Sequence, residues 1–155
     1  MHLVAAPLSN PRTDLPIVAI AVDRLRLAKR RWRGKAADGV EFGFELETPL
    51  KPDAFVWETE EAQYRIAQEP ESLLEISLAI TPSAAAGIGW AIGNLHLELS
   101  ADADRLLTPD DPAARQLLER LRVPYNTVMG VFRPGRFVRG DAVNAAQELG
   151  SSHRH

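Results

Sequence analysis

The hydrophobic pattern of this chain changes its period at Glu69-Pro70-Glu71, and no other feature of the sequence limits the fold as strongly. Between Pro16 and Gln68 apolar and polar residues alternate with a period of two, which is typical of half-buried strands. Beyond this point helical periodicity and alternation follow each other. Because proline and charge interrupt the pattern here, we expect a domain boundary. The chain is therefore predicted to be an α+β protein whose first part is all-β.

The first part, residues 1–69, is predicted to be a small β domain of about five or six strands. Residues 17–22 are wholly apolar, which predicts a strand buried on both faces. Leu25 and Leu27 alternate with arginines and continue the strand pattern. Asp38-Gly39 predicts a hairpin, because glycine adopts the positive φ that a tight primed turn requires. No helical pattern of useful length is expected in this part.

The second part, residues 70–138, is predicted to follow the order β-α-β-β-α-β. This order favours a ferredoxin-like sheet with both helices on one face. Pro82 and Pro112 mark the first turns of the two helices. The alternating segment from Leu95 to Ser100 is predicted to be the second strand, with His96 on the face opposite the leucines.

The last part, residues 139–155, is predicted to be a flexible tail, because apolar content falls from Arg139 onward. A short helix over residues 142–149 is also compatible with the pattern. His153 and His155 lie at the end of this tail.

Composition excludes several classes of function. The chain has no cysteine, so it has no disulfides, no thiolate zinc site and no cysteine nucleophile, and a metal site must use His, Asp or Glu. Its formal net charge of −3 argues against a surface dedicated to nucleic acid. No apolar run approaches the roughly 18 residues of a membrane span, and no signal-like segment is found at the start. We therefore expect a cytoplasmic protein without a membrane partner.

His96 is the candidate metal ligand within the predicted domains. One imidazole cannot hold a metal ion tightly, and a lone histidine is more often a surface residue without a ligand. A twofold axis near residue 96 would bring two copies together, because a C2 interface pairs the same residue of each protomer. Neutral imidazoles suit nickel, zinc or copper. His153 and His155 would add further imidazoles if the tail reaches this axis.

The basic run from Lys29 to Lys35 has two interpretations. It could contact RNA or an acidic protein surface, or it could protect an exposed strand from edge pairing. The acidic total favours edge protection or a protein partner. An RNA-binding ferredoxin-like module would also need aromatic residues on the open face of its sheet, and the strands around His96 and Leu106 offer none.

Catalysis is poorly supported by the sequence. An enzyme could use His96 as a general base beside Glu98 or Asp104. However, the chain has no phosphate-binding glycine loop, no nucleophile elbow and no zincin motif. The aspartates at 102, 104, 110 and 111 are explained by turns and helix caps at least as well as by a calcium site.

Several segments together resemble the urease accessory protein E (UreE) family of nickel metallochaperones, over about residues 18 to 138. The Gly-Asn-x-His segment followed by an alternating stretch is the most specific of them. They are, in order, Leu25-Arg26-Leu27 with the basic run, Asp38-Gly39, the segment from Tyr64 to Glu71, and Gly93-Asn94-Leu95-His96.

The resemblance implies a homodimer with an N-terminal domain similar to a peptide-binding chaperone module and a ferredoxin-like metal-binding domain. It implies that His96 of both protomers binds Ni²⁺ at the dimer interface, and that Zn²⁺ or Cu²⁺ can substitute. His153 and His155 would be a reduced form of the histidine-rich tail of the family. The implied partners are an accessory GTPase and the urease apoprotein, with no nucleic acid and no enzymatic activity. The alternative is an RNA- or protein-binding module without a metal role.

The chain departs from the family pattern just before the second predicted helix. Many members carry His-x-His there, whereas this chain has Asp110-Asp111-Pro112. The resemblance therefore implies that the peripheral metal site of those members is absent or altered, and that nickel capacity is low.

Overall fold

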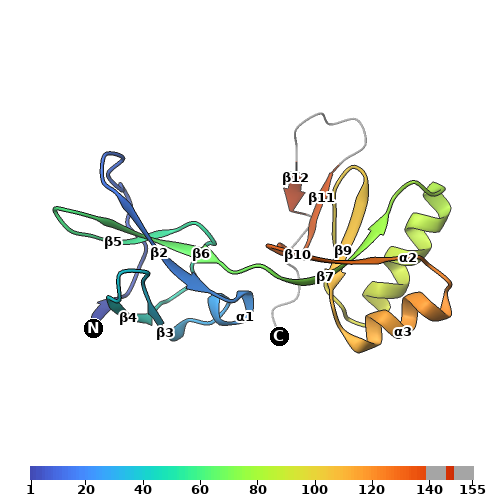
Figure 1. Cartoon of the computed structure of the whole chain (residues 1–155), viewed down its shortest axis with the longest axis horizontal. Helices are drawn as coiled ribbons and strands as arrows, with labels where there is room; N and C mark the ends of the chain where they lie inside the picture. Colours follow the sequence, from blue (N-terminus) through green and yellow to red (C-terminus); the bar gives the residue numbers. More distant parts are fainter. Residues whose placement is uncertain (139–145, 149–155) are drawn as a thin grey trace. The chain divides into compact units, whose positions relative to one another are not determined.

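The structure is a computed structural model, and it describes residues 1–138 and 146–148 (Figure 1). The chain divides into two compact units, Met1–Glu69 and Pro70–His155. The division coincides with the change of period in the hydrophobic pattern. The labels of helices and strands are those of Figure 1.

The first unit consists of strands and one short helix. Its elements are β1 (His2–Val4), β2 (Ile17–Val22), α1 (Arg24–Leu27), β3 (Arg31–Lys35), β4 (Glu41–Glu45), β5 (Phe55–Glu58) and β6 (Gln63–Gln68). The strands form two three-stranded sheets in the orders β1-β4-β3 and β2-β6-β5. Both sheets contribute to one core, with Phe42 and Phe44 from the first and Ile20 and Ile66 from the second. The expectation of an all-β arrangement is confirmed.

The hairpin predicted at Asp38-Gly39 is also confirmed. β3 and β4 pair antiparallel on either side of it, and Gly39 has a φ of +92°. The hydroxyl of Tyr64 donates a hydrogen bond to Asp38 Oδ2 at 2.7 Å, and the Val40 amide donates to Asp38 Oδ1 at 3.1 Å. The bond from Tyr64 is the main reason that the pKa of Asp38 is lowered. Because Tyr64 is buried, these bonds tie the turn to the core.

The prediction that residues 17–22 are buried on both faces is wrong. Ile17 is 49% exposed, and Ala19 and Ala21 are exposed as well. β2 lies at the edge of its sheet, and only its other face contributes to the core, through Ile20 and Val22. An apolar sequence therefore does not prove burial on both faces.

Leu25 and Leu27 do not continue a strand, as their alternation predicts. They lie in α1, a single helical turn. The carboxylate of Asp23 accepts a hydrogen bond from the Arg26 amide at 2.8 Å and so caps this turn. The capping bond outweighs a pattern that is too short to distinguish a strand from a helix.

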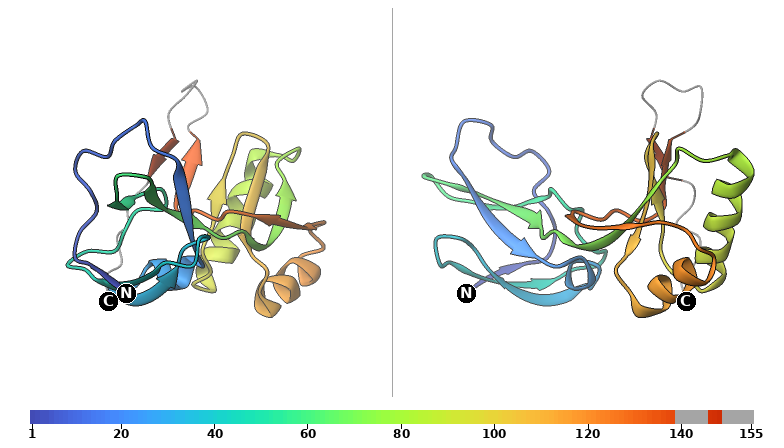
Figure 2. Two further views of the ribbon diagram at one scale, coloured as in Figure 1. Left: turned by 60° about the vertical axis from the view of Figure 1, so that its left-hand side comes forward. Right: turned by 45° about the vertical axis from the view of Figure 1, so that its right-hand side comes forward.

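The second unit contains a sheet with two helices on one face (Figure 2). Its elements are β7 (Glu71–Ser77), α2 (Pro82–Asn94), β8 (Ser100–Ala101), β9 (Arg105–Pro109), α3 (Pro112–Arg120), β10 (Asn126–Gly130), β11 (Arg136–Val138) and β12 (Ala146–Glu148). The sheet order is β10-β7-β9-β8-β11-β12. From β7 to β10 the chain follows the predicted β-α-β-β-α-β order, so the ferredoxin-like fold is confirmed.

The core of the second unit lies between the helices and the sheet. Leu74 and Ile76 of β7 point into it, together with Ile92 of α2 and Leu117 and Leu118 of α3. The helices begin where the prolines predict. Thr81 caps α2 through a bond from the Ala84 amide at 3.2 Å, and Asp111 caps α3.

Phe132 packs on the other face of this sheet. This side chain is 1% exposed and packs with Leu73 and Leu107. An RNA-binding sheet needs exposed aromatic rings on which bases can stack. Among the described residues of this cluster the one aromatic side chain, Phe132, is buried. This arrangement does not favour the RNA-binding alternative.

The region predicted as a tail is described only in part. β12 covers residues 146–148 and pairs antiparallel with β11. The suggestion of a short helix over residues 142–149 is therefore wrong for these three residues, which form a strand. The rest of this segment, with His153 and His155, lies outside the described residues. None of the described helices is long and apolar enough to cross a membrane.

Candidate metal-binding site

The candidate site is built by the C-terminal end of α2. Leu95 is the C-cap residue that follows Asn94, the last residue of the helix. The His96 amide donates to the Gly93 carbonyl at 2.9 Å, and the Leu97 amide donates to the Ile92 carbonyl at 3.3 Å. These two bonds form a Schellman motif, and Leu97 packs against the hydrophobic core that includes Ile92. The motif satisfies helix carbonyls that would otherwise lack a partner.

The prediction that residues 95–100 form a strand is therefore wrong for all but Ser100. His96 does not alternate with leucines on a sheet face. The capping bonds hold residues 95–97 in a turn, and Leu97 and Leu99 reach the core from that turn. Leu95 is 40% exposed and does not share a buried face with the other two leucines, as the alternating pattern suggests.

His96 has a left-handed backbone conformation with a φ of +57° and is exposed. Glycine is the usual residue at this position of the motif, because a side chain there is strained. Histidine is among the residue types that adopt this conformation more readily than most. The fold thus fixes the backbone of the candidate ligand while the side chain is accessible to solvent.

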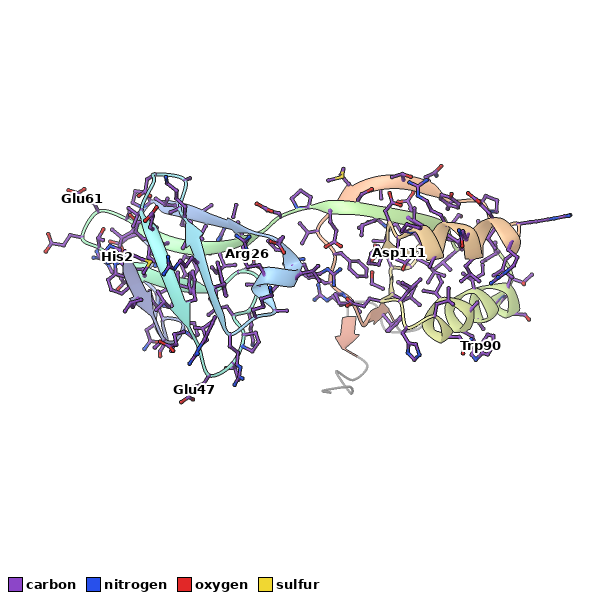
Figure 3. All side chains as sticks on the ribbon, turned by 90° about the horizontal axis from the view of Figure 1, so that it is seen from below. His2, Arg26, Glu47, Glu61, Trp90 and Asp111 are labelled. Atoms are coloured by element: carbon purple, nitrogen blue, oxygen red, sulfur yellow. The ribbon has the colours of Figure 1, made fainter. Side chains whose placement is uncertain are left out.

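The outer face of α2 is apolar and open to solvent. The helix runs for 13 residues without one charged side chain. Trp90 is 72% exposed, and Figure 3 shows it on the outer side of α2. In the described part of the chain, a Cβ added at Gly87 or Gly93 would meet nothing within 4 Å beyond the backbone of its own helix. Since residues three apart are neighbours on a helix, Gly87, Trp90 and Gly93 form one strip, called here the glycine-tryptophan strip.

No single chain assembles a complete metal site in the described part of the molecule. The described residues contain no group of three or more His, Asp or Glu side chains that could hold a metal ion. His2 lies in the first unit, where it stacks on Trp57 with ring centroids 4.6 Å apart. His96 is thus the candidate ligand that the second unit presents, and the structure does not place His153 or His155.

Asp110 and Asp111 are already engaged in hydrogen bonds. Asp110 Oδ1 accepts from Arg115 Nε at 2.6 Å, and Asp110 Oδ2 accepts from Arg115 Nη2 at 2.9 Å and from Ser72 Oγ at 2.8 Å. The bonds from Arg115 and Ser72 lower the pKa of Asp110 to about 2. Asp111 accepts from the Ala113 amide at 2.7 Å as the cap of α3, where Figure 3 shows it. These carboxylates serve the fold.

A cavity of about 670 Å³ lies beside the turn between β8 and β9. Its lining includes Glu75, Asp102 and Asp104, but also Arg105. Arg105 donates to Glu75 at 2.8 Å and to Asp102 at 3.0 Å, so a cation of the protein already binds two of these three carboxylates. His96 does not line this cavity. The arrangement gives no support to an enzyme that uses His96 as a general base beside Asp104.

Sequence reasoning pointed to His96 as a candidate ligand but gave no sign of the glycine-tryptophan strip. The sequence did contain a signal for this strip. Residues 82–94 include one tryptophan and three glycines but no charged residue. Helices that are apolar all round are normally covered on every side. That pattern predicts a partner surface rather than a solvent-facing helix.

Comparison with known proteins places the second unit in context. Residues 71–155 match a family model described as the UreE urease accessory protein, C-terminal domain. The chain is 32% identical over 120 residues to the urease accessory protein UreE of Deinococcus radiodurans, which covers 76% of this chain and 74% of the relative. It is 24% identical over 131 residues to a protein of the same name from Bifidobacterium longum subsp. infantis, which covers 84% of this chain and 58% of the relative.

Proposed function

Because this chain belongs to the UreE urease accessory protein family, we propose that it is a nickel-binding metallochaperone that delivers Ni²⁺ during maturation of the urease active site. We further propose that the metal is held at the interface of a homodimer by His96 of each protomer. The family consists of accessory proteins, not enzymes, so no reaction is assigned to the chain.

The observation that carries this proposal is the position of His96 at the end of an uncovered apolar helix. A twofold axis beside the exposed imidazole would bring together two equivalent nitrogen ligands. One imidazole alone holds a divalent ion weakly, so the described part of a single chain is an incomplete site. The second copy supplies what the first lacks.

The glycine-tryptophan strip supports a second copy of this chain as the covering partner. Glycine within a helix destabilises it by about 0.5–1 kcal/mol relative to alanine, and no contact among the described residues explains Gly87 or Gly93. Their lack of side chains would let a second helix approach closely. Covering Trp90 would contribute roughly 1.5–3 kcal/mol, the range for burial of a large apolar side chain.

A site with few protein ligands suits a carrier. Structural zinc sites use four protein ligands and hold the ion, whereas a site that keeps open positions can exchange ligands with an acceptor. His153 and His155 are proposed as additional ligands from the tail. Zn²⁺ and Cu²⁺ are expected to substitute for Ni²⁺, since imidazole binds all three ions.

The proposed recipients are a complex of the accessory GTPase and the urease apoprotein, in the cytoplasm. Family membership supports this part of the proposal. Neither nucleic acid nor a membrane is among the proposed partners.

Calorimetric titration with Ni²⁺, combined with sedimentation analysis, tests the site. The parent chain is expected to bind one high-affinity Ni²⁺ per two chains, and His96→Ala is expected to lose at least about tenfold in affinity. His2→Ala is the matched control, because it removes a histidine from the other unit. If His96→Ala binds as tightly as the parent, the ligand assignment is wrong. The double variant H153A/H155A tests the tail separately.

A further inference from the structure

The first unit presents a positively charged depression on the outward face of the sheet β1-β4-β3. It has a volume of about 320 Å³, and its lining includes Met1, Arg26, Arg33, Lys35 and Glu41. This depression, called here the basic pocket, lies in the unit Met1–Glu69, whereas His96 lies in the other unit. We propose that the basic pocket docks an extended acidic segment of a partner protein that also carries an apolar side chain.

The charge of the basic pocket is not balanced by the described residues that line it. Three cations line it against one carboxylate, that of Glu41. Among the described residues, Arg33 and Lys35 form no ion pair. The neighbouring Arg31 differs, because it forms an ion pair at 2.8 Å with Glu45 on the adjacent strand. Unpaired cations of this kind complement carboxylates of a partner.

Arg26 extends this positive charge to α1, where Figure 3 shows it. Among the described residues its ionic contact is with Asp23 at 3.7 Å, and both side chains are at least half exposed. An exposed pair at this distance contributes little, so the guanidinium can turn to a new partner.

Exposed apolar side chains lie beside these cations. Leu3 is 70% exposed and Met1 is 65% exposed. Both lie over Gly43, where an added Cβ would come within 3.1 Å of Leu3 Cδ2 and 3.4 Å of Met1 Cε. The glycine thus lets the two side chains rest directly on the sheet. Apolar surface flanked by unpaired charge is typical of a binding site for an amphipathic segment.

Protection of an edge strand accounts for only part of this arrangement. β3 is an edge strand, and charged side chains there discourage pairing with other chains. That role explains Arg33 and Lys35 but gives no reason for exposing Leu3 and Met1 next to them.

RNA fits this surface less well than an acidic peptide. Binding of single-stranded nucleic acid combines positive charge with exposed aromatic rings on which bases stack. The rings of Trp32, Phe42 and Phe44 in this sheet are buried. The chain as a whole also carries a formal net charge of −3.

Fluorescence anisotropy with the full chain tests the proposal. The probe is a short labelled peptide in which glutamate alternates with leucine, and the comparison probes are a lysine-leucine peptide and a short oligouridylate. The glutamate-leucine peptide is expected to bind, with an affinity that falls as salt rises. Arg33→Glu and Lys35→Glu are each expected to weaken binding by at least about tenfold. Lys29→Glu, the matched control, makes the same charge change outside the basic pocket and should have a much smaller effect.

A second pair of variants tests the apolar part. Leu3→Ser is expected to weaken peptide binding by at least about threefold, and Leu25→Ser, at a leucine that is 66% exposed on α1, is the control that should not. The proposal is overturned if the glutamate-leucine peptide fails to bind, if Lys29→Glu acts as strongly as Arg33→Glu, or if only the oligouridylate binds. Ni²⁺ affinity should be the same in all these variants, so this test is independent of the metal site.

Discussion

His96 and Arg122 occupy equivalent positions at the ends of the two long helices of the second unit. Their φ values are +57° and +55°, and each amide donates to the carbonyl three residues earlier, Gly93 for His96 and Glu119 for Arg122. Both are exposed. The same capping motif therefore places a strained, non-glycine residue at each helix end, and the pair offers an internal comparison.

Glycine at either position is expected to stabilise the fold by the same amount. Only the change at His96 is expected to weaken metal binding. His96→Gly and Arg122→Gly should each raise the free energy of unfolding by about 1 kcal/mol, because glycine removes the strain of the left-handed conformation. Urea unfolding without metal measures this change. His96→Gly alone should lose Ni²⁺ affinity. Equal loss of Ni²⁺ affinity in Arg122→Gly would contradict the role given to His96.

Replacement of Trp90 by a charged residue is expected to prevent self-association without unfolding the chain. Trp90→Glu places a carboxylate in the centre of the glycine-tryptophan strip, where a partner helix would bury it unpaired. Sedimentation should show at least about a hundredfold weaker dimer, with circular dichroism unchanged. Met129→Glu is the control, since Met129 is also highly exposed, at 68%, on β10. A dimer that survives Trp90→Glu would place the interface elsewhere.

Gly87 is expected to allow close helix packing in the dimer, although it lowers the stability of the single chain. Gly87→Ala should stabilise the helix by about 0.5–1 kcal/mol, because alanine is the better helix former and, among the described residues, nothing beyond the backbone of the helix itself lies within 4 Å of the new Cβ. Thermal unfolding in the Trp90→Glu background measures this effect without association. Gly87→Leu should weaken the dimer when Trp90 is present, because its bulk keeps the helices apart. An unchanged dimer constant for Gly87→Leu would show that the helices do not meet at this position.

The order of elements could be predicted from the sequence because local signals agreed with the tertiary structure. Pro82 and Pro112 begin their helices, and Asp38-Gly39 forms its hairpin. Each signal acts within a few residues and depends on steric or hydrogen-bonding properties of the residue itself. Such features do not depend on which distant segments pack together.

The candidate site was predicted only in part, because its conformation depends on competition between local structures. Leu95, Leu97 and Leu99 alternate as a strand does, yet helix capping bonds hold the first two in a turn. Alternation over six residues carries too little information to predict which structure wins. The sequence indicates His96 as a candidate ligand, but it does not predict the left-handed backbone conformation of this residue.

Acid is expected to weaken the fold through Asp110. Its pKa is lowered from 3.8 to about 2 in the folded chain, mainly by the hydrogen bond from Arg115. The unfolded chain therefore binds this proton first as pH falls, so the contribution of Asp110 is complete above pH 4 and is lost between about pH 4 and pH 2. Asp110→Asn should lower the free energy of unfolding near neutral pH by about 1–3 kcal/mol, the range for hydrogen bonds to a charged group.

The pH profile of unfolding distinguishes this mechanism from a general loss of packing. The free energies of unfolding of the parent and of Asp110→Asn, measured with urea, should differ most above pH 4. They should approach each other as the pH falls to about 2 and below, where the Asp110 carboxyl becomes protonated in the folded chain as well. Asp104→Asn is the control, since this exposed aspartate has no side-chain hydrogen bond in the described structure, and it should change stability by less than about 0.5 kcal/mol. A difference between the parent and Asp110→Asn that stays constant down to pH 2 would mean that the ion pair with Arg115 is not its source.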